Sequence, residues 1–268
     1  MLRNPFLEIG FATNSGAIIS MESVGNQLNP LTFTLPREEP GRVPFMGHFI
    51  CAPRWGDPGE AELANGSIKH GDISSQLWDI VKQTENCLEA EAVSETDGIL
   101  VNKKITMAAG SPVVCIEDNL TNLSAVRRPG NLVQHPTIAS PFLNANTRVD
   151  CSAAEALLHR GNGIEATACG TWPWVTDASG TGIDLRTPQN TSSAVYSFTS
   201  LQQPTSWITA FDPQSNLLLG YCWERSVYPW IHHWIYQENN QIKYRGLEFG
   251  TAGLHQPIDV IMRNNWHS

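Results

Sequence analysis

The chain has no stretch in which apolar residues recur at helical spacing, and this absence constrains its fold more than any other feature. Short runs with strand-like patterns are found instead, separated by glycine, proline and asparagine. In residues 112–123, for example, apolar and polar residues alternate from Val114 onward. A period of two is typical of a strand with one buried face, and many short strands with this punctuation predict an all-β sandwich or barrel.

The same reasoning predicts strands elsewhere, and one short helix. The predicted strands are residues 16–22, 99–108 and 244–250, together with a hairpin over 207–224 that turns at the sequence DPQSN. The helical candidate is residues 153–159. Residues 36–44 and 127–130 are predicted to be long loops. Because no repeat or linker interrupts the pattern, residues 1–268 are expected to form a single domain.

Composition limits the classes of function. The net charge of −9 disfavours a nucleic-acid binder, which usually has a basic face. No stretch approaches the roughly 20 apolar residues of a membrane helix, and the polar start does not resemble a signal peptide, so a cytoplasmic protein is expected. The six cysteines form no CxxC pair, and the motif HExxH is absent, so no metal site is expected.

Residues 47–78 form the stretch with the densest set of chemically useful side chains. Arg54 and His70 lie among glycines and prolines, with Gly71 directly after the histidine. Such a segment favours loops over a scaffold, where function often resides. Two simpler explanations remain open: His70 can be an ordinary loop histidine, and Arg54 can form a surface salt bridge.

Two further candidates lie downstream. His135 precedes a proline at the end of a strand-like run, where it could be catalytic or purely structural. Glu248 lies between Leu247 and Phe249, so burial would raise the pKa of its carboxyl and suit it to act as a general base. Alternatively, its side chain could face water from a strand.

The tryptophans are a third group of candidates. The chain has nine, and we expect the apolar face of a sugar to pack on Trp78 and Trp230. Tryptophan in β proteins is more often a core residue, and that alternative also stays open. His232 and His233 are adjacent, so on a regular strand they point to opposite faces and cannot both bind one metal.

The order of these motifs resembles the aldose 1-epimerase (galactose mutarotase-like) family. The motifs that carry the resemblance are PRWG (53–56), NGSIKHG (65–71), QHPTIASPF (134–142), YPWIHHW (228–234) and RGLEFGTAG (245–253). The resemblance implies a large antiparallel β-supersandwich and an enzyme without a cofactor. It also implies that His135 is the general acid and Glu248 the general base, and that His70 and Arg54 bind sugar hydroxyls and the ring oxygen.

Two departures from the family pattern concern the substrate. Galactose mutarotases have a hydroxyl-binding aspartate in a region that here reads AVYSFTSLQ (194–202), without an acid. The sugar-phosphate branch has an arginine where this chain has Ser74. We therefore expect a mutarotase of a free, unphosphorylated sugar, acting as a monomer or homodimer. The alternatives are a non-catalytic carbohydrate-binding or sensing protein and, third, a lyase acting on an acidic sugar.

Overall fold

The computed structural model describes residues 1–160, 165–188, 192–253 and 255–263. Nearly all of its regular structure is strand, and each strand pair among these residues is antiparallel. The all-β prediction and the antiparallel supersandwich are therefore confirmed. Within the described part of the chain, no helix has the length and apolar character needed to cross a membrane.

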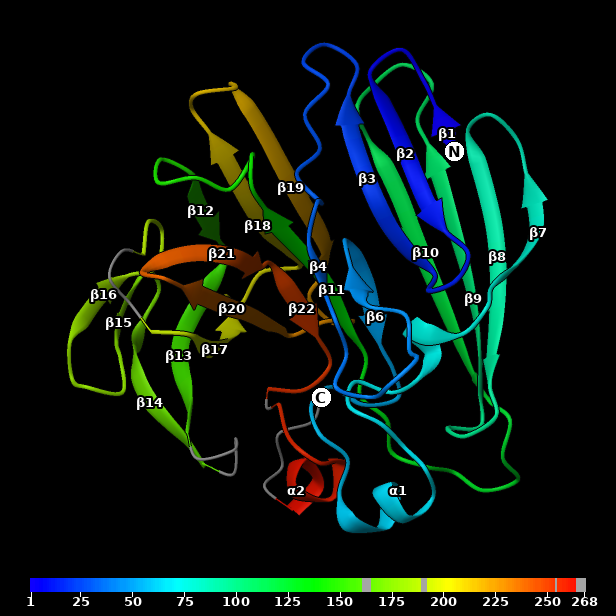
Figure 1. The fold of residues 1–268 in the computed structure, drawn as a ribbon. Helices are drawn as coiled ribbons and strands as arrows, with labels where there is room; N and C mark the ends of the chain where they lie inside the picture. Colours follow the sequence, from blue (N-terminus) through cyan, green and yellow to red (C-terminus); the bar gives the residue numbers. More distant parts are fainter. Residues whose placement is uncertain (161–164, 189–191, 254, 264–268) are drawn as a thin grey trace.

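A 13-stranded sheet organises the molecule (Figure 1). In spatial order its strands are β1 (Leu2–Arg3), β2 (Leu7–Ala12), β3 (Ala17–Ser23), β6 (His48–Cys51), β11 (Val133–Ala139), β21 (Gln241–Gly246), β20 (Trp230–Glu238), β17 (Ala194–Ser200), β13 (Ala153–Arg160), β14 (Glu165–Thr171), β15 (Trp174–Thr176) and β16 (Gly182–Asp184). Strand β22 (Glu248–Gly250) pairs with both β11 and β20, at the middle of this order.

Three smaller sheets and three short helices complete the described fold. The sheets are β10 (Val114–Asn122), β9 (Ile99–Met107), β8 (Cys87–Ser94) and β7 (Asp79–Gln83); β12 (Arg148–Cys151), β18 (Thr205–Asp212) and β19 (Leu217–Glu224); and β4 (Thr34–Leu35) with β5 (Phe45–Met46). The helices are α1 (Glu60–Ala64), the 3₁₀ helix η1 (Ile73–Ser75) and α2 (Ile258–Arg263). In Figure 1 the four-stranded sheet lies alongside β1–β3, and Ile9, Leu88 and Val101 from the two sheets share one apolar core.

The strand predictions are confirmed closely. Strand β10 alternates between half-buried and exposed side chains from Val114 to Asp118, and the predicted hairpin is the pair β18–β19. The predicted strand at 244–250 is two strands, because β21 ends at Gly246 and β22 begins at Glu248. The loops at 36–44 and 127–130 contain no helix or strand.

The helical prediction for residues 153–159 is wrong, because this run is β13 (Ala153–Arg160). Its alanines and leucines favour helix as isolated residues. However, β13 is paired with β14 on one side and β17 on the other, and Ala156 and Leu158 are buried while Glu155 is exposed. Pairing on both edges and period-two burial outweigh local propensity here.

A buried polar network joins the four-stranded sheet to β11. The Lys103 ammonium lies 2.8 Å from the Asp118 carboxylate, and Gln134 donates a hydrogen bond to that carboxylate at 2.8 Å. The Gln134 carbonyl oxygen in turn faces Nε2 of His48 at 2.9 Å, so Nε2 of the imidazole is the donor. The network fixes β11, the strand that carries His135, against β6 and the smaller sheet.

His48 makes the stability of the protein depend on pH. Burial lowers the pKa of His48 to about 4, whereas an unfolded chain has a histidine pKa of about 6.5. As the pH falls below about 6.5, the unfolded chain therefore binds a proton that the folded chain refuses, and folding loses stability until about pH 4. We expect His48→Asn to reduce this loss, with a slope smaller by up to about 1.4 kcal/mol per pH unit.

The measurement is the free energy of unfolding from urea denaturation at pH 4.5, 5.5 and 6.5 in both proteins. Comparing the two proteins cancels the carboxylates and the other histidines, which they share. Parallel pH profiles for wild type and His48→Asn would contradict the assignment of a neutral buried imidazole.

Candidate active site

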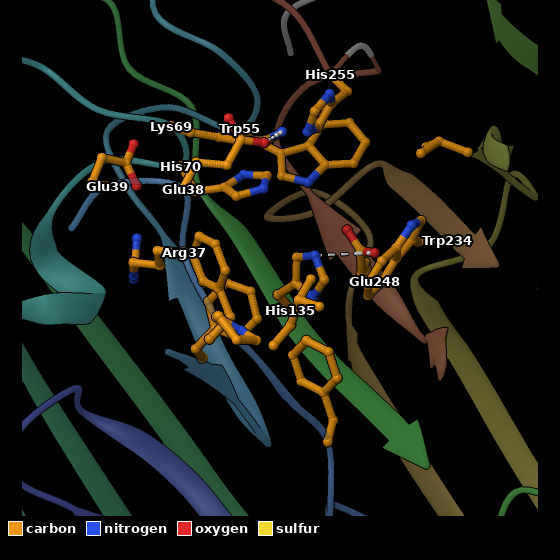
Figure 2. Close-up of a pocket in the computed structure, with 16 residues that line it drawn as sticks. Arg37, Glu38, Glu39, Trp55, Lys69, His70, His135, Trp234, Glu248 and His255 are labelled. Atoms are coloured by element: carbon orange, nitrogen blue, oxygen red, sulfur yellow. Dashed lines mark ion pairs between the residues drawn. The ribbon is translucent and has the colours of Figure 1, made fainter. Parts of the chain in front are cut away.

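A cavity of about 170 Å³ lies over the centre of the large sheet (Figure 2). Its wall is built by residues from neighbouring strands: Phe49 on β6, His135 on β11, Trp234 on β20 and Glu248 on β22. The strand order places β11 between β6 and the β21–β22 segment, so residues distant in sequence meet in one place. The two residues predicted to carry the proton-transfer chemistry are both in this wall.

His135 and Glu248 are in direct contact. Nε2 of His135 lies 3.2 Å from Oε1 of Glu248, and the side chains are almost fully buried. The other ring nitrogen, Nδ1, lies 3.0 Å from the Thr137 hydroxyl, which can donate or accept a hydrogen bond. The imidazole also stacks on Phe49, with ring centroids 4.3 Å apart. Thr137 and Phe49 thus hold the ring facing the carboxyl in either tautomer.

Burial shifts the two pKa values in opposite directions. It lowers the pKa of His135 to about 3, and it raises the pKa of Glu248 well above its ordinary value. Both shifts favour the uncharged pair, a carboxylic acid beside a neutral imidazole. Transfer of one proton across the 3.2 Å contact converts this pair into a carboxylate beside an imidazolium. The pair can therefore offer an acid and a base in either arrangement, as proton exchange with a substrate requires.

Trp55 supports Glu248 from one side. Its side chain lowers the pKa of Glu248, in partial opposition to burial. The Trp55 ring lies over His232, with centroids 4.0 Å apart, and His232 pairs with Glu248 in the β20–β22 register. Trp55 also lines the cavity. The sequence does not predict this role for Trp55, although the residue follows Arg54 directly.

Gly246 leaves the space that the Glu248 carboxyl occupies, since a Cβ atom at this position would overlap Oε1 of Glu248. We expect Gly246→Ala to displace the carboxyl from His135 and to slow any proton transfer that this pair catalyses about 10²-fold, since a displacement near 1 Å can cost this much. The measurement is the rate of the reaction proposed below, together with the affinity for its substrate.

A matched control is Gly182→Ala on β16, where a Cβ atom would meet nothing within 4 Å. The control should retain the wild-type rate. A Gly246→Ala protein with full activity would show that the position of the Glu248 carboxyl is unimportant.

His70 reaches the cavity from a sharply turned loop. Its φ is +63°, followed by +71° at Gly71, where any Cβ atom would clash with the carbonyl oxygen of Ala52. The backbone N–H of Gly56 donates to Nδ1 of His70 at 3.1 Å, so the neutral ring carries its proton on Nε2. Burial lowers the pKa of His70 well below its ordinary value, which keeps the ring neutral. The structure thus places His70 in the cavity wall, and its role in binding sugar stays a prediction.

A third imidazole in the cavity was missed. His255 lines it from the segment before α2, with its ring centroid 5.1 Å from that of His70 and 4.9 Å from that of Trp55. Burial lowers the pKa of His255 to about 3. The only sequence signal was its place in a His-Gln-Pro run after a glycine-rich strand, and nothing local separates it from an ordinary loop histidine.

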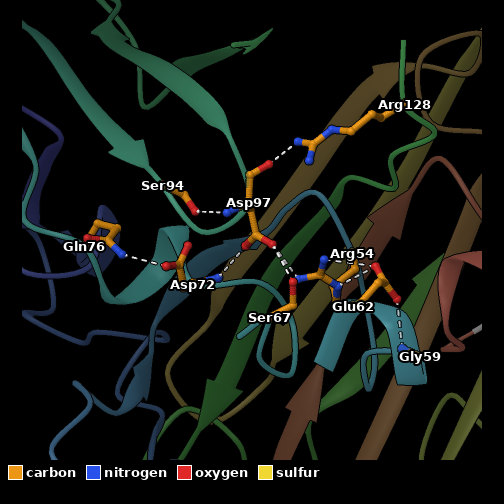
Figure 3. A network of polar contacts seen from close by, with 9 residues as sticks. All are labelled: Arg54, Gly59, Glu62, Ser67, Asp72, Gln76, Ser94, Asp97 and Arg128. Carbon is orange, nitrogen blue, oxygen red and sulfur yellow. Dashed lines mark hydrogen bonds and ion pairs between the residues drawn. The ribbon is translucent and has the colours of Figure 1, made fainter. Parts of the chain in front are cut away.

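Arg54 does not line the cavity but holds a buried network behind it (Figure 3). Its guanidinium lies 2.8 Å from the Asp97 carboxylate and 2.9 Å from that of Glu62. Asp97 also accepts hydrogen bonds from Ser67 and from the backbone N–H of Asp72. The structure thus gives Arg54 a structural role rather than the predicted role in binding sugar. The salt-bridge alternative is the better description, with the difference that the bridge is buried.

Trp78 and Trp230 also lie outside the cavity lining. Trp78 is a core residue: it is 2% exposed, donates to the carbonyl of Ile73 and meets Phe11 edge to face. Trp230 lies at the start of β20 and lines a separate surface depression. On β20 it is Trp234, four residues later on the same face, that reaches the cavity.

His232 and His233 point to opposite faces, as expected for adjacent strand residues. Nδ1 of His232 lies 2.7 Å from the Ser197 hydroxyl, while His233 stacks on Trp172 and lies 3.5 Å from Sγ of Cys151. Over the described ranges, no group of three or more histidine, cysteine, aspartate and glutamate side chains is arranged to hold a metal ion.

Comparison with known proteins supports the fold through structure rather than sequence. No known protein-family profile and no curated protein sequence matches the chain. Solved structures do. The galactose mutarotase related enzyme of Lactobacillus acidophilus superposes with a TM-score of 0.64 at 10% identity, covering 93% of this chain and 84% of the other. For a candidate aldose 1-epimerase of Klebsiella pneumoniae the TM-score is 0.67 at 13% identity, with 98% and 72% covered.

A candidate aldose 1-epimerase of Escherichia coli gives a TM-score of 0.62 at 14% identity, covering 97% of this chain and 90% of the other. The agreement extends over nearly the whole chain in all three comparisons. At these identities the likeness concerns the arrangement of the backbone, and the chain has the galactose mutarotase-like fold.

Proposed function

We propose that the protein is an aldose 1-epimerase that interconverts the α and β anomers of a free, unphosphorylated sugar. The observation that carries the proposal is the contact between His135 and Glu248 inside a cavity of monosaccharide scale. The two oxygens that exchange protons in this reaction, the anomeric hydroxyl and the ring oxygen, are bonded to the same carbon. An acid and a base that serve them must lie side by side, as these two groups do.

In each step the pair takes one proton from the sugar and returns one proton to it, so the protons balance. In the uncharged form, His135 removes the anomeric hydroxyl proton while Glu248 protonates the ring oxygen. The bond between C1 and the ring oxygen breaks, and the aldehyde forms. After rotation about C1–C2, the carboxylate and imidazolium reverse these transfers as the ring closes on the other face. If the reaction starts from the ionised pair, the imidazolium of His135 is the acid and the carboxylate of Glu248 is the base. This is the assignment that the family resemblance implies.

The other residues of the cavity suit a sugar. Nε2–H of His70 is a donor for a hydroxyl or ring oxygen, given that its Nδ1 already accepts from Gly56. Trp234, which is half-buried, provides ring surface for an apolar C–H face of the sugar, and the buried rings of Phe49 and Trp55 form part of the cavity wall. Fixed groups of this kind reduce the entropy cost of aligning the reacting atoms.

The test is polarimetry on freshly dissolved crystalline anomers of a panel of aldoses, with and without the protein. Faster approach to the equilibrium rotation for at least one aldose is the expected result. Binding without acceleration would favour a non-catalytic carbohydrate-binding protein instead. An unsaturated product that absorbs in the ultraviolet would favour a lyase. Either of these outcomes contradicts the proposal.

A further inference from the structure

Arg37 is a buried cation in the cavity wall with an unused donor. It comes from the loop of residues 36–44 and is 9% exposed. Its Nε donates to the carbonyl of Val43 at 2.8 Å and its Nη2 donates to the Ser74 hydroxyl at 2.6 Å. The guanidinium carbon lies 3.7 Å from the centroid of the Phe45 ring. Nη1 is buried and has no hydrogen-bond partner among the described residues.

The charge of this guanidinium is only weakly compensated. Both acceptors, the carbonyl of Val43 and the hydroxyl of Ser74, are uncharged. Burial lowers the pKa of Arg37 to about 10 against weaker opposing effects of Cys51, Glu39 and Asp72, so the guanidinium remains a cation at neutral pH. A buried charge with an unpaired donor is costly unless an anion meets it. The anion that arginine recognises best is a planar carboxylate or a phosphate.

The surroundings favour a carboxylate over a phosphate. Glu38 and Glu39 line the same cavity, and they would repel a group with nearly two negative charges more strongly than a carboxylate with one. Lys69 also lines the cavity, but its ammonium lies 3.7 Å from the Asp57 carboxylate and 4.0 Å from that of Glu38. These two ion pairs partly neutralise its charge. A single free –NH₂ of Arg37 offers donors for one carboxylate and few for the several oxygens of a phosphate.

The order of groups in the cavity matches a sugar with a terminal carboxylate. Figure 2 shows Arg37 and Glu248 on opposite sides of His135. In the ring form of a hexuronate, the ring oxygen likewise lies between the anomeric carbon and the carbon that bears the carboxylate. A sugar with its anomeric hydroxyl and ring oxygen at the Glu248–His135 pair therefore extends its carboxylate toward Arg37.

We propose that the cavity is a hexuronate site in which Nη1 of Arg37 binds the carboxylate of the substrate. Ser74 holds the guanidinium in place from the side. This inference rests on the proposed epimerase function for the sugar's orientation, while the carboxylate contact itself can be tested by binding alone. It also gives Ser74 a defined role, because its hydroxyl accepts a hydrogen bond from Nη2 of Arg37.

The first experiment compares kcat/KM for glucuronate with glucose and for galacturonate with galactose, each by anomer interconversion. We expect the wild type to prefer the uronate about 10–100-fold, the usual effect of a hydrogen bond to a charged group. Arg37→Met should reduce this ratio toward one. Arg42→Met is the matched control, because Arg42 lies on the same loop, is exposed and binds Ser75 outside the cavity; it should keep the wild-type ratio.

Several outcomes would overturn the inference. They are equal rates on uronate and neutral sugar in the wild type, a stronger preference for glucose 6-phosphate, or a uronate preference that survives Arg37→Met. The wild-type ratio decides the question even if Arg37→Met fails to fold. If no sugar is interconverted, the epimerase proposal fails, and calorimetry with glucuronate and glucose still tests the Arg37 contact. Tighter binding of glucuronate than of glucose then supports it, and equal binding or no glucuronate binding refutes it.

Discussion

Glu248→Gln is expected to lower the catalysed rate of anomer interconversion by about 10²–10⁴-fold, the usual contribution of one acid–base group. The amide keeps the shape of the carboxyl and can still hydrogen-bond, but it cannot exchange a proton with the sugar. Since proton transfer belongs to the transition state, kcat should fall while KM changes little. Combining the change with His135→Asn should cost little more than either change alone, because the two residues act as one unit.

Measuring the free energy of unfolding of Glu248→Gln distinguishes a loss of catalysis from a loss of folded protein. Burial raises the pKa of Glu248, so the folded state disfavours its ionised form as the pH rises. Removing the ionisable group should therefore leave the free energy of unfolding unchanged at low pH and increase it at high pH. Glu224→Gln, on an exposed position of β19, is the matched control and should retain the wild-type rate. Retention of more than a tenth of the wild-type rate in Glu248→Gln would show that another group is the proton carrier.

Asp97→Ala is expected to lower the free energy of unfolding by about 3–5 kcal/mol, the usual cost of removing one partner from a buried ion pair. The Asp97 side chain is fully buried, and besides Arg54 it accepts hydrogen bonds from Ser67 and the backbone of Asp72. The backbone carbonyl of Asp97 also accepts from Arg128 (Figure 3). The alanine variant leaves the Arg54 guanidinium with Glu62 alone, and it leaves the Ser67 hydroxyl and the backbone N–H of Asp72 without the carboxylate that accepted from them. Urea denaturation measures the change.

The matched control is Arg3→Ala, which breaks an exposed ion pair with Glu8. Exposed pairs contribute about 0–1 kcal/mol, so this variant should be nearly as stable as the wild type. A loss below about 1 kcal/mol in Asp97→Ala would contradict the structural role assigned to Arg54. In that case the role in sugar binding predicted from the sequence would have to be reconsidered.

Strand patterns made most of this fold predictable, and long-range pairing explains the exceptions. The alternation in residues 112–123 identified β10, because one face of that strand meets the core and the other meets water. The helix predicted for residues 153–159 is wrong because alanine and leucine favour a helix only locally. In the fold, β14 and β17 pair with the two edges of this run and make it a strand. Nothing within the run itself carries that information.

Site residues within a distinctive motif could be predicted from the sequence. Site residues whose role depends on the direction in which a loop side chain points could not. His135 and Glu248 were identified through their motifs, and the structure brings them into contact. In PRWG the sequence predicts a binding role for the arginine, but Trp55 lines the cavity while Arg54 forms an ion pair with Asp97. Which of two neighbours points inward depends on loop geometry that one sequence does not reveal. Arg37 was missed for the same reason, since its loop folds back to Ser74.

Two-dimensional exchange NMR of a sugar at anomeric equilibrium tests the central claim most directly. Catalysis appears as cross-peaks between the α and β anomeric protons, without any change in the composition of the sample. We predict cross-peaks for at least one aldose with wild-type protein, and their disappearance with Glu248→Gln under identical conditions. Cross-peaks of equal intensity with both proteins, or none with the wild type for any aldose tested, would contradict the claim that His135 and Glu248 catalyse mutarotation in this cavity.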